Sequence, residues 1–432
     1  MSPSVVGAIG IIALVVLIFA RMNIGITMGL IGVVGFGVLL GFEPAMGLLR
    51  TVPYTTFANQ DLSVIPLFVL MGSFAFTAGI SEDMYRTVYI WLGRFRGGLA
   101  MATVAASALF AAICGSSIAT AATLGKVAMP EMNKYNYAPS LSTGSLAAGG
   151  TLGILIPPSV MLLLYGILTE QSIAKLFLAG FVPGIIQALF YLLVIIVVTQ
   201  RNPLLGPPGP QFPLKEKLLA AKGISEVVIL FLVVIGGLYL GIFTPTEAAG
   251  IGAFGAFLAM LYRRKVNWPN LRDSLMETTQ TTGMLFLIIL GAMLLNYFLS
   301  VTRMPFELAN WVGTLEVNRH IIFMVIVFLY IFLGALMDEL AIMLLTIPVI
   351  FPVVIGLGYD PIWFGIIAIK LMEMGMILPP VGMNVFVIQG ITNVPMGTVY
   401  RGVIPFIISD FIQIILLLIF PQIVTFVPNL MQ

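Results

Sequence analysis

The sequence predicts an all-α polytopic membrane protein made of two inverted repeats, each with a re-entrant hairpin and a Pro-Pro broken helix. Three observations support this fold class. Apolar residues make up 60% of the 432 residues and charged residues only 9%, whereas average soluble domains carry about 25% charged residues. Apolar runs long enough for a spanning helix, which needs about 20 residues, recur along the whole chain. A constant shift of 222 positions aligns "GILIPPSVM" (153–161) with "GMILPPVGM" (375–383).

The apolar runs predict the spanning segments in chain order. We expect spans near 3–20, 23–41, 62–80, 138–168 (broken), 172–200, 224–243, 247–262, 278–300, 361–390 (broken) and 403–427. Lys and Arg accumulate in cytoplasmic loops, and this bias is strongest when the N-terminus lies outside. Only Arg50, Lys175, Arg303 and Arg319 then fall in outer loops. The glycines of 23–41 have small-xxx-small spacing, which is typical of helix packing.

The repeat divides the chain into four parts. They are N-terminal scaffold helices at 1–61, a first repeat at 62–200, central scaffold helices with a cytoplasmic linker at 201–277, and a second repeat at 278–432. In the predicted topology, span 62–80 runs inward and its counterpart 278–300 runs outward. The halves are therefore predicted to be inverted, an arrangement typical of secondary carriers with sites near the bilayer midplane.

Two further apolar stretches, 99–130 and 321–354, are interrupted by "CGSS" and "MDEL". The topology puts both ends of each stretch on one side of the membrane. Each is therefore predicted to be a re-entrant hairpin of two half-length helices, the first entering from the cytoplasm and the second from outside. If instead each stretch crossed fully, the positive-inside pattern after it would collapse, and the segment from Arg201 to Arg272 would lie outside.

The Pro-Pro breaks should lie beside the hairpin tips. A proline removes a backbone donor, and unpaired backbone groups survive in lipid only where they are buried or line a polar cavity. Unwound carbonyls can bind a small cation, and half-helix N-termini can bind an anion. We expect glycine-assisted unwinding at 149–153 and a cation site in each half, with an organic substrate between them. The alternative is that the serines and threonines only cap half-helices.

Ionisable residues inside spans are functional candidates. Lys370 and Glu373 are three residues apart, so a structural ion pair is slightly favoured. Asp338 and Glu339 have no local cation, which favours a role beside a bound cation for at least one of them. Asp410 is assigned no role beyond an interfacial or packing one.

The chain resembles a known family in four stretches: "IPLFVLMGSFAFTAGI", "GGTLGILIPPSVMLLLYGILTEQSIAKLFLAGFVPGI", "GIFTPTEAAGIGA" and "GMILPPVGMNVFVIQGI". Together they resemble the large, DctM-type membrane subunit of tripartite ATP-independent periplasmic (TRAP) transporters. The resemblance implies sodium-driven import of an organic acid, such as sialic acid, a dicarboxylate or another sugar acid, across the bacterial inner membrane, with a periplasmic N-terminus. It implies an elevator mechanism, a separate four-helix small subunit and a periplasmic substrate-binding protein as partners, and no cofactor besides sodium.

The resemblance also implies residue roles. A first sodium site would involve Gly115, Ser116, Ser117, Gly149, Gly150, Thr151 and Gly153. A second would involve Leu336, Asp338, Glu339, Met372, Glu373 and Gly375. The substrate would contact Pro157, Pro158, Ser159, Pro379, Pro380, Met383 and Asn384.

Other functions are weighed against this one. A stand-alone sodium–carboxylate symporter would share the layout without a binding protein. A membrane-embedded enzyme is remote, because a single histidine cannot supply paired haem ligands and a single cysteine cannot hold a metal cluster. The net charge of +2 gives no indication of nucleic-acid binding.

Overall fold

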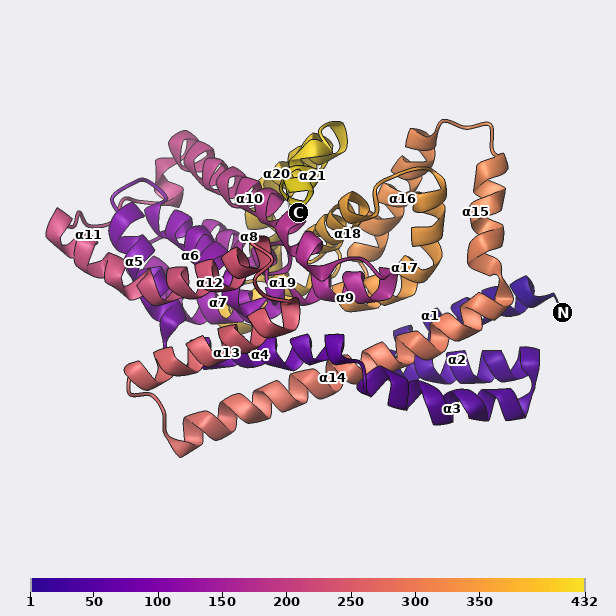
Figure 1. Cartoon of the computed structure of the whole chain (residues 1–432). Coiled ribbons are helices and arrows are strands. Elements are labelled where there is room, and N and C mark those ends of the chain that lie inside the picture. Colours follow the sequence, from indigo (N-terminus) through magenta and orange to yellow (C-terminus); the bar gives the residue numbers. More distant parts are fainter. Residues whose placement is uncertain (1, 431–432) are drawn as a thin grey trace.

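The computed structural model describes residues 2–430, which form α-helices and short 3-10 helices with no β-strand among them (Figure 1). The helices of the first half are α1 (Pro3–Phe19), α2 (Ile24–Leu40), α3 (Phe42–Phe57), η1 (Gln60–Ser63), α4 (Val64–Thr77), α5 (Ile80–Leu92), α6 (Gly98–Cys114), α7 (Ser117–Lys134), α8 (Pro139–Leu155), α9 (Val160–Thr169), α10 (Ile173–Arg201), η2 (Pro203–Leu205) and α11 (Leu214–Ala221). Those that follow are η3 (Lys222–Ile224), α12 (Ser225–Tyr239), α13 (Pro245–Tyr262), α14 (Trp268–Thr302), α15 (Met304–Thr314), α16 (Arg319–Gly334), α17 (Glu339–Gly356), α18 (Pro361–Gly375), α19 (Met383–Thr392), α20 (Met396–Ile419) and α21 (Gln422–Leu430).

Within the described part of the chain, seven helical segments are long and apolar enough to cross a membrane by length and composition. They include the broken pair α8–α9 and the long helices α10, α14 and α20. The helices α1 and α2, which the sequence predicts as spans, are apolar but have 17 residues each. The all-helical, polytopic fold class is therefore confirmed.

Both broken helices are confirmed. In the first half, α8 ends at Leu155 and α9 begins at Val160, with the two prolines between them. In the second half, α18 ends at Gly375 and α19 begins at Met383. A proline has no amide to continue the helical hydrogen-bond ladder, so each double proline lies in a non-helical connection. The Pro157–Pro158 and Pro379–Pro380 bonds are both cis.

The two predicted hairpins are confirmed as helix pairs with short tips. The arms of the first, α6 and α7, pack on each other, as do α16 and α17 of the second. The arms are longer than the predicted half-length helices. They have 16 to 18 residues, which corresponds to roughly 24–27 Å at 1.5 Å per residue.

Four helices fall outside the predicted spans and hairpins: α3, α5, α11 and α15. A fifth short helix, α21, begins inside the predicted span 403–427 and is separated from α20. These helices have 8 to 16 residues, which is too short for a spanning-length hydropathy signal. One of them, α5, buries Ile80, Met84 and Ile90 on one side and carries charged residues elsewhere. Its apolar face packs against α6.

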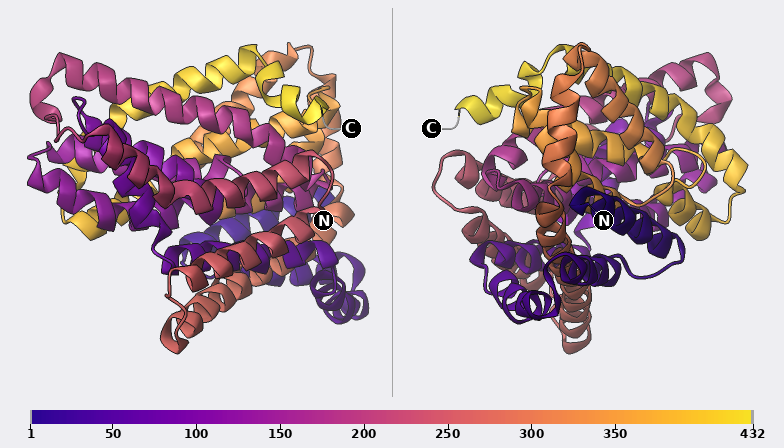
Figure 2. Two further views of the ribbon diagram at one scale, coloured as in Figure 1. Left: turned by 60° about the vertical axis from the view of Figure 1, so that its left-hand side comes forward. Right: turned by 90° about the vertical axis from the view of Figure 1, so that its right-hand side faces the viewer.

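The helices form two layers. We call α1–α4 and α12–α14 the scaffold layer, in which α14 packs along α2 and α4, and α13 packs along α4. We call α6–α10 and α16–α20 the core layer. Figures 1 and 2 show α10 and α20 on the opposite side of the molecule from α14. The predicted glycine packing of 23–41 is confirmed, because a Cβ on Gly25 or Gly32 would lie within 3 Å of the α14 backbone.

Helix α8 occupies the centre of the core layer. It contacts α6, α7, α10, α18, α19 and α20, and every residue from Leu141 to Leu155 is buried. Glycine permits the closest of these approaches: Gly144 of α8 lies against the backbone of Gly402 in α20. A helix that packs on six neighbours presents no face to lipid, which suits it to hold an internal site.

The two halves share one order of elements. A hairpin, a broken helix and a long helix follow one another as α6–α7, α8–α9 and α10, and again as α16–α17, α18–α19 and α20. Figure 1 shows the first hairpin on the left of the core layer and the second on the right. The opposite orientation of the two halves in the bilayer, and the four-part division of the chain, stay predictions.

Candidate functional site

The tip of the first hairpin touches the first break. Helix α6 ends at Gly115, which has a φ of +63°, in the left-handed region where glycine is favoured at helix C-termini. A Cβ on Gly115 would lie 2.6 Å from the carbonyl oxygen of Pro158. The predicted meeting of hairpin tip and Pro-Pro break is therefore present in the first half.

Ser116 caps the second arm of this hairpin. Its hydroxyl accepts a hydrogen bond from the Ala119 amide at 3.4 Å, and its carbonyl accepts one from the Thr120 hydroxyl at 2.7 Å. The same carbonyl faces α8, because a Cβ on Gly153 would lie 2.6 Å from it. The capping alternative is thus confirmed for Ser116.

The glycine run of α8 does not unwind, so that part of the prediction is wrong. Gly149, Gly150 and Gly153 are all helical, because the helix breaks only where the prolines remove amides. These glycines instead provide room for the first hairpin. A Cβ on Gly149 would lie 2.8 Å from the Ser107 hydroxyl of α6, and one on Gly150 would lie 2.6 Å from the Ala121 Cβ of α7.

Thr151 lies away from the first tip. Its hydroxyl donates to the Ala148 carbonyl at 2.7 Å and lies 3.2 Å from the Tyr191 hydroxyl of α10. Successive helical residues differ by about 100° around the axis, so Thr151 points toward α10 while Gly150 faces α7. The structure does not bring Thr151 together with Ser116 and Ser117.

Ser117 contacts the second half of the chain. The Asn384 side-chain amide donates to the Ser117 hydroxyl at 2.7 Å and to the Ala147 carbonyl of α8 at 3.2 Å. All three groups are buried, and the Asn384 Oδ1 atom has no hydrogen-bond partner. Asn384, predicted to bind substrate, therefore contacts a residue predicted for the first sodium site and links α19 to the tip of the first hairpin.

The tip of the second hairpin touches the second break. The Val381 amide, directly after Pro380, donates to the Ala335 carbonyl at 3.2 Å. Gly334 and Gly375 lie so close that a Cβ on Gly375 would be 2.5 Å from the Gly334 Cα. The second half thus repeats the contact between tip and break, with different residues.

The acidic residues of the second tip divide in role. Asp338 caps α17 by accepting a hydrogen bond from the Ala341 amide at 3.1 Å. The Oε2 atom of Glu339 is buried and has no hydrogen-bond partner. Leu336 lies in the tip itself, and Met372 is fully buried in α18. Glu339 is therefore the acidic residue at this tip that has a buried carboxylate oxygen without a hydrogen-bond partner.

Glu373 belongs to a buried charge cluster. Lys370 lies 3.5 Å from Glu373 and 2.8 Å from Asp410 of α20. Gln187 donates to Glu373, and the Tyr191 hydroxyl donates to Asp410 at 2.9 Å. The favoured Lys370–Glu373 pair is present, but Asp410, for which the sequence suggested only an interfacial or packing role, forms the shorter ion pair.

The two breaks differ in exposure. Pro157, Pro158 and Ser159 are buried, and Ser159 caps α9 by accepting from the Leu162 amide at 3.3 Å. Pro379 and Pro380 are exposed. The Pro380 carbonyl accepts a hydrogen bond from the Tyr400 hydroxyl at 2.8 Å, and Met383 is half-buried at the start of α19.

A cavity of about 330 Å³ reaches the first tip from the scaffold layer. It lies between α4 and α14 on one side and the first hairpin with the start of α9 on the other. Its polar lining consists of Ser73, Cys114, Ser116, Thr123, Lys126, Glu277 and Thr281. None of the seven residues predicted to contact substrate lines it, so the space beside the tip lies between the layers and not between the two broken helices.

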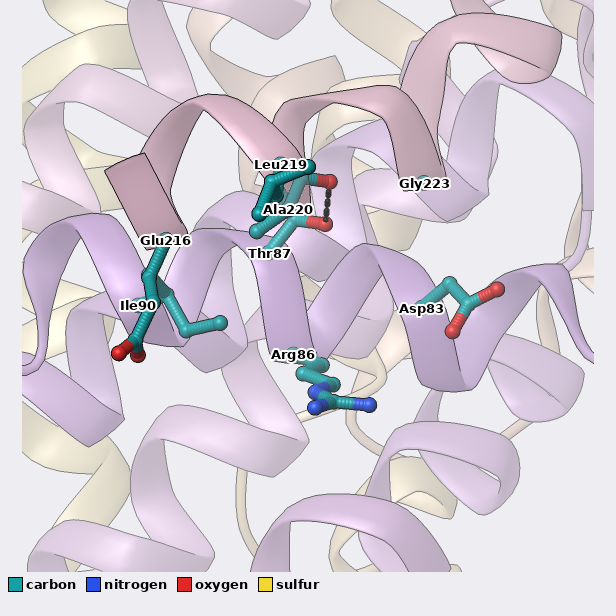
Figure 3. Close-up of a pocket in the computed structure, with 8 residues that line it drawn as sticks. All are labelled: Asp83, Arg86, Thr87, Ile90, Glu216, Leu219, Ala220 and Gly223. Carbon is teal, nitrogen blue, oxygen red and sulfur yellow. Dashed lines mark hydrogen bonds between the residues drawn. The ribbon is translucent and has the colours of Figure 1, made fainter. Parts of the chain in front are cut away.

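A second polar cavity, of about 390 Å³, lies between α5 and α11 (Figure 3). The Thr87 hydroxyl donates to the Ala220 carbonyl at 2.8 Å across it. One of its lining residues, Asp83, is paired with Arg263, which also bonds Glu226 at 2.7 Å. This cavity touches neither tip nor break. The ion pairs of Arg263 with Asp83 and Glu226 join the end of α13 to α5 and α12.

Sequence reasoning missed Lys126, Glu277, Gln187 and Tyr191. The sequence topology counted Lys126 only among the cytoplasmic cations, although it lines the cavity. Glu277 could have been noticed from the sequence as an acidic residue close to the start of the apolar segment that forms α14. Among residues 2–430, no group of three or more His, Cys, Asp or Glu side chains could hold a metal ion.

Comparisons with known proteins agree over nearly the whole chain. A family model described as "Tripartite ATP-independent periplasmic transporter, DctM component" matches residues 11–423. The C4-dicarboxylate TRAP transporter large permease protein DctM of Pseudomonas aeruginosa is 36% identical over 400 residues, which cover 92% of each chain. The sialic acid TRAP transporter large permease protein SiaM of Vibrio cholerae is 31% identical over 373 residues, covering 86% of this chain and 87% of the relative.

A solved structure shares the fold at lower sequence identity. MtrF of Neisseria gonorrhoeae, described as illuminating a class of antimetabolite efflux pumps, superposes with a TM-score of 0.60 at 13% identity. The superposition covers 88% of this chain and 85% of MtrF. At that identity the likeness concerns the arrangement of helices alone.

Proposed function

The chain belongs to the DctM component family of tripartite ATP-independent periplasmic (TRAP) transporters, and we propose that it imports an organic acid together with sodium ions. The proposed carrier is a multi-pass protein of the bacterial inner membrane with its N-terminus in the periplasm. Permeases of this family are transporters and not enzymes, and we assign the chain no catalytic residue.

One observation carries the sodium proposal: a hairpin tip contacts a Pro-Pro break twice, once in each half. In the first half Gly115 lies against the Pro158 carbonyl, and in the second the Val381 amide bonds the Ala335 carbonyl. Such junctions leave carbonyl and hydroxyl oxygens outside helical ladders, which are the ligands a small hard cation takes. We propose one sodium ion at each junction.

At the first junction, the Ser116 and Ser117 hydroxyls are the proposed ligand sources, with Gly149, Gly150 and Gly153 giving them room. At the second, Glu339 is the proposed charged ligand because its Oε2 atom is buried without a partner. Sodium bound at either junction would hold tip and break together. This would couple ion binding to the shape of the cavity beside the first tip.

The substrate proposal follows from relatives whose names specify C4-dicarboxylate and sialic acid transport. We propose an organic acid of this size class as the cargo, a periplasmic binding protein as its source, and a separate small membrane subunit as partner. An elevator movement is proposed between the two layers, because the cavity of about 330 Å³ lies at their boundary.

Reconstituted transport tests this function. The chain, its small subunit and the binding protein are placed in liposomes, and uptake of labelled sialic acid and succinate is measured at increasing external sodium. We expect steep sodium activation that is weaker in Ser117→Ala and in Glu339→Gln, while both variants keep the melting temperature of the wild type within a few degrees. Unchanged sodium activation in both variants would defeat the site assignment.

The same assay separates the alternative function. A stand-alone sodium–carboxylate symporter would take up substrate at full rate when the binding protein is left out. We expect uptake to depend on the binding protein instead.

A further inference from the structure

The cavity beside the first hairpin tip carries one charge of each sign. Lys126 lies on α7 and Glu277 on α14, and both line the cavity. Among residues 2–430, neither side chain forms an ion pair. Both side chains are exposed, so a ligand that enters the cavity can reach them.

Lys126 belongs to a stripe that begins at the tip. Ser116, Ala119, Thr123 and Lys126 all line the cavity, and their spacing of three or four residues puts them on one face of α7. Ser116 and Lys126 are separated by roughly 15 Å along the helix axis at 1.5 Å per residue. Side chains on a helix lean toward its N-terminus, which for α7 is the hairpin tip. The Lys126 ammonium therefore lies closer to Ser116 than this axial distance, and the gap that is left matches the length of a small organic acid.

Glu277 faces this stripe from the scaffold layer. The Ser73 hydroxyl of α4 donates to its Oε2 atom at 2.6 Å, and Thr281, one turn further along α14, lines the same cavity. The bond from Ser73 fixes the carboxylate on the cavity wall. A carboxylate there accepts hydrogen bonds and repels a second anion.

Resting on the proposed function, we infer that this site selects acids with a single carboxylate and a hydrogen-bond-donating far end, and rejects dicarboxylates. Lys126 binds the carboxylate of the cargo, and Glu277 accepts from its hydroxyl, amide or ammonium groups. A dicarboxylate would bring its second negative charge to Glu277 and leave two like charges unpaired, which is how sites discriminate between similar ligands.

A matched ligand pair tests the inference on the purified complex of this chain with its small subunit, in sodium buffer. Succinate and succinamate differ only in the exchange of one carboxylate for a carboxamide. Isothermal titration is expected to show succinamate binding at least tenfold more tightly than succinate. In Glu277→Gln this preference should fall below threefold, and in Lys126→Gln the affinity for succinamate should fall at least tenfold.

The control variants alter nearby charges that lie outside the cavity lining. Asp273→Asn, one turn before Glu277 on α14, and Lys134→Gln, at the end of α7, should keep the wild-type preference. Equal or tighter binding of succinate by the wild type would overturn the inference, as would no binding of either acid. Retained affinity for succinamate in Lys126→Gln would also overturn it.

Three further outcomes are distinguishable. If Lys126→Glu and Glu277→Lys each abolish binding and the double variant restores wild-type behaviour, the two residues pair with each other across the layers, and the inference is wrong. If succinate is the better ligand and its uptake is sodium-driven, the inference fails while the proposed function stands. If no acid is taken up with sodium, the proposed function itself fails.

Discussion

Asn384 connects two segments that lie 267 residues apart in the sequence. Its side-chain amide satisfies the Ser117 hydroxyl and the Ala147 carbonyl in a fully buried setting. A buried hydrogen bond adds only modestly to the free energy of unfolding. Its loss costs more, because the remaining polar group is buried with neither water nor a protein group to bond. Asn384 is therefore a residue where stability and ion binding are expected to change together.

Asn384→Ala should lower the free energy of unfolding by about 1–3 kcal/mol, because it leaves a buried hydroxyl and carbonyl unpaired. The measurement is denaturant unfolding of the purified chain in detergent, with and without sodium. We expect sodium to stabilise the variant less than the wild type. Asn310→Ala, an exposed position on α15, is the control. An equal sodium effect in Asn384→Ala and wild type would disprove the link to the first site.

Lys370 is the sole cation of a cluster that contains two buried carboxylates. Removing one partner of a buried ion pair leaves an uncompensated charge, which costs about 3–5 kcal/mol. Lys370→Met should therefore lower the melting temperature sharply. The double variant with Asp410→Asn should recover a large part of the loss, since it removes one orphaned charge. A Lys370→Met chain as stable as the wild type would show that the carboxylates are already neutral.

At the scale of elements, the junction of hairpin tip and broken helix is the recurring unit. Gly115 has a left-handed φ and no room for a Cβ beside the Pro158 carbonyl. Gly334 and Gly375 meet at backbone contact in the other half. Both junctions therefore depend on glycine where two non-helical segments approach each other.

Gly115→Ala should destabilise the chain by at least roughly 1–2 kcal/mol, the cost of a left-handed non-glycine residue, before any clash with Pro158 is added. We also expect weaker sodium activation of uptake, because the tip must move away from the break. Gly313→Ala is the matched control, since a Cβ there meets nothing within 4 Å. Wild-type stability and sodium response in Gly115→Ala would contradict the tight junction.

The sequence predicted the elements whose cause is local. Double prolines break helices wherever they occur, so both breaks fell at the predicted positions. The hairpin tips followed from polar residues inside apolar runs. The short helices α3, α5 and α15 could not be predicted from hydropathy, because they have 11 to 16 residues and give no apolar run of spanning length.

The site was predicted less completely than the fold. The pairing of Gly115 with the first break and the buried pair of Lys370 and Glu373 followed from sequence. The direction in which Thr151 points and the partner of Asn384 did not, because both depend on how α8 is rotated against its neighbours. Glu277 reaches the cavity only through the packing of α14 on α4.

At the scale of the whole molecule, the boundary between the layers is where movement is proposed. Gly72 of α4 packs against the first hairpin, and a Cβ at that position would lie 3.4 Å from the Cys114 Cα. The two Cα atoms are then at most about 5 Å apart, and disulfides usually join residues whose Cα atoms lie about 4.4–6.8 Å apart. Cys114 is the single cysteine of the chain, so one substitution creates a unique cross-layer pair.

Gly72→Cys should form a disulfide with Cys114 under mild oxidation and join the scaffold layer to the core layer. If the layers slide during transport, oxidation should reduce uptake at least tenfold, and a reductant should restore it. The variant that also carries Cys114→Ser controls for the effect of the oxidant. Full uptake by the cross-linked chain would exclude sliding at this boundary.

The hydrogen bond between Asn384 and Ser117 has a consequence for how such proteins can be recombined. The first half supplies the Ser117 hydroxyl and the second half supplies the Asn384 amide that bonds it, and both groups are fully buried. One half therefore cannot be exchanged for that of another protein without regard to this contact. A chimera that takes its N-terminal half from one homologue and its C-terminal half from another inherits a working contact only when the donor and acceptor at these two positions match. When hybrid permeases are designed, the two parent proteins should therefore carry a matching donor and acceptor at the positions of Asn384 and Ser117.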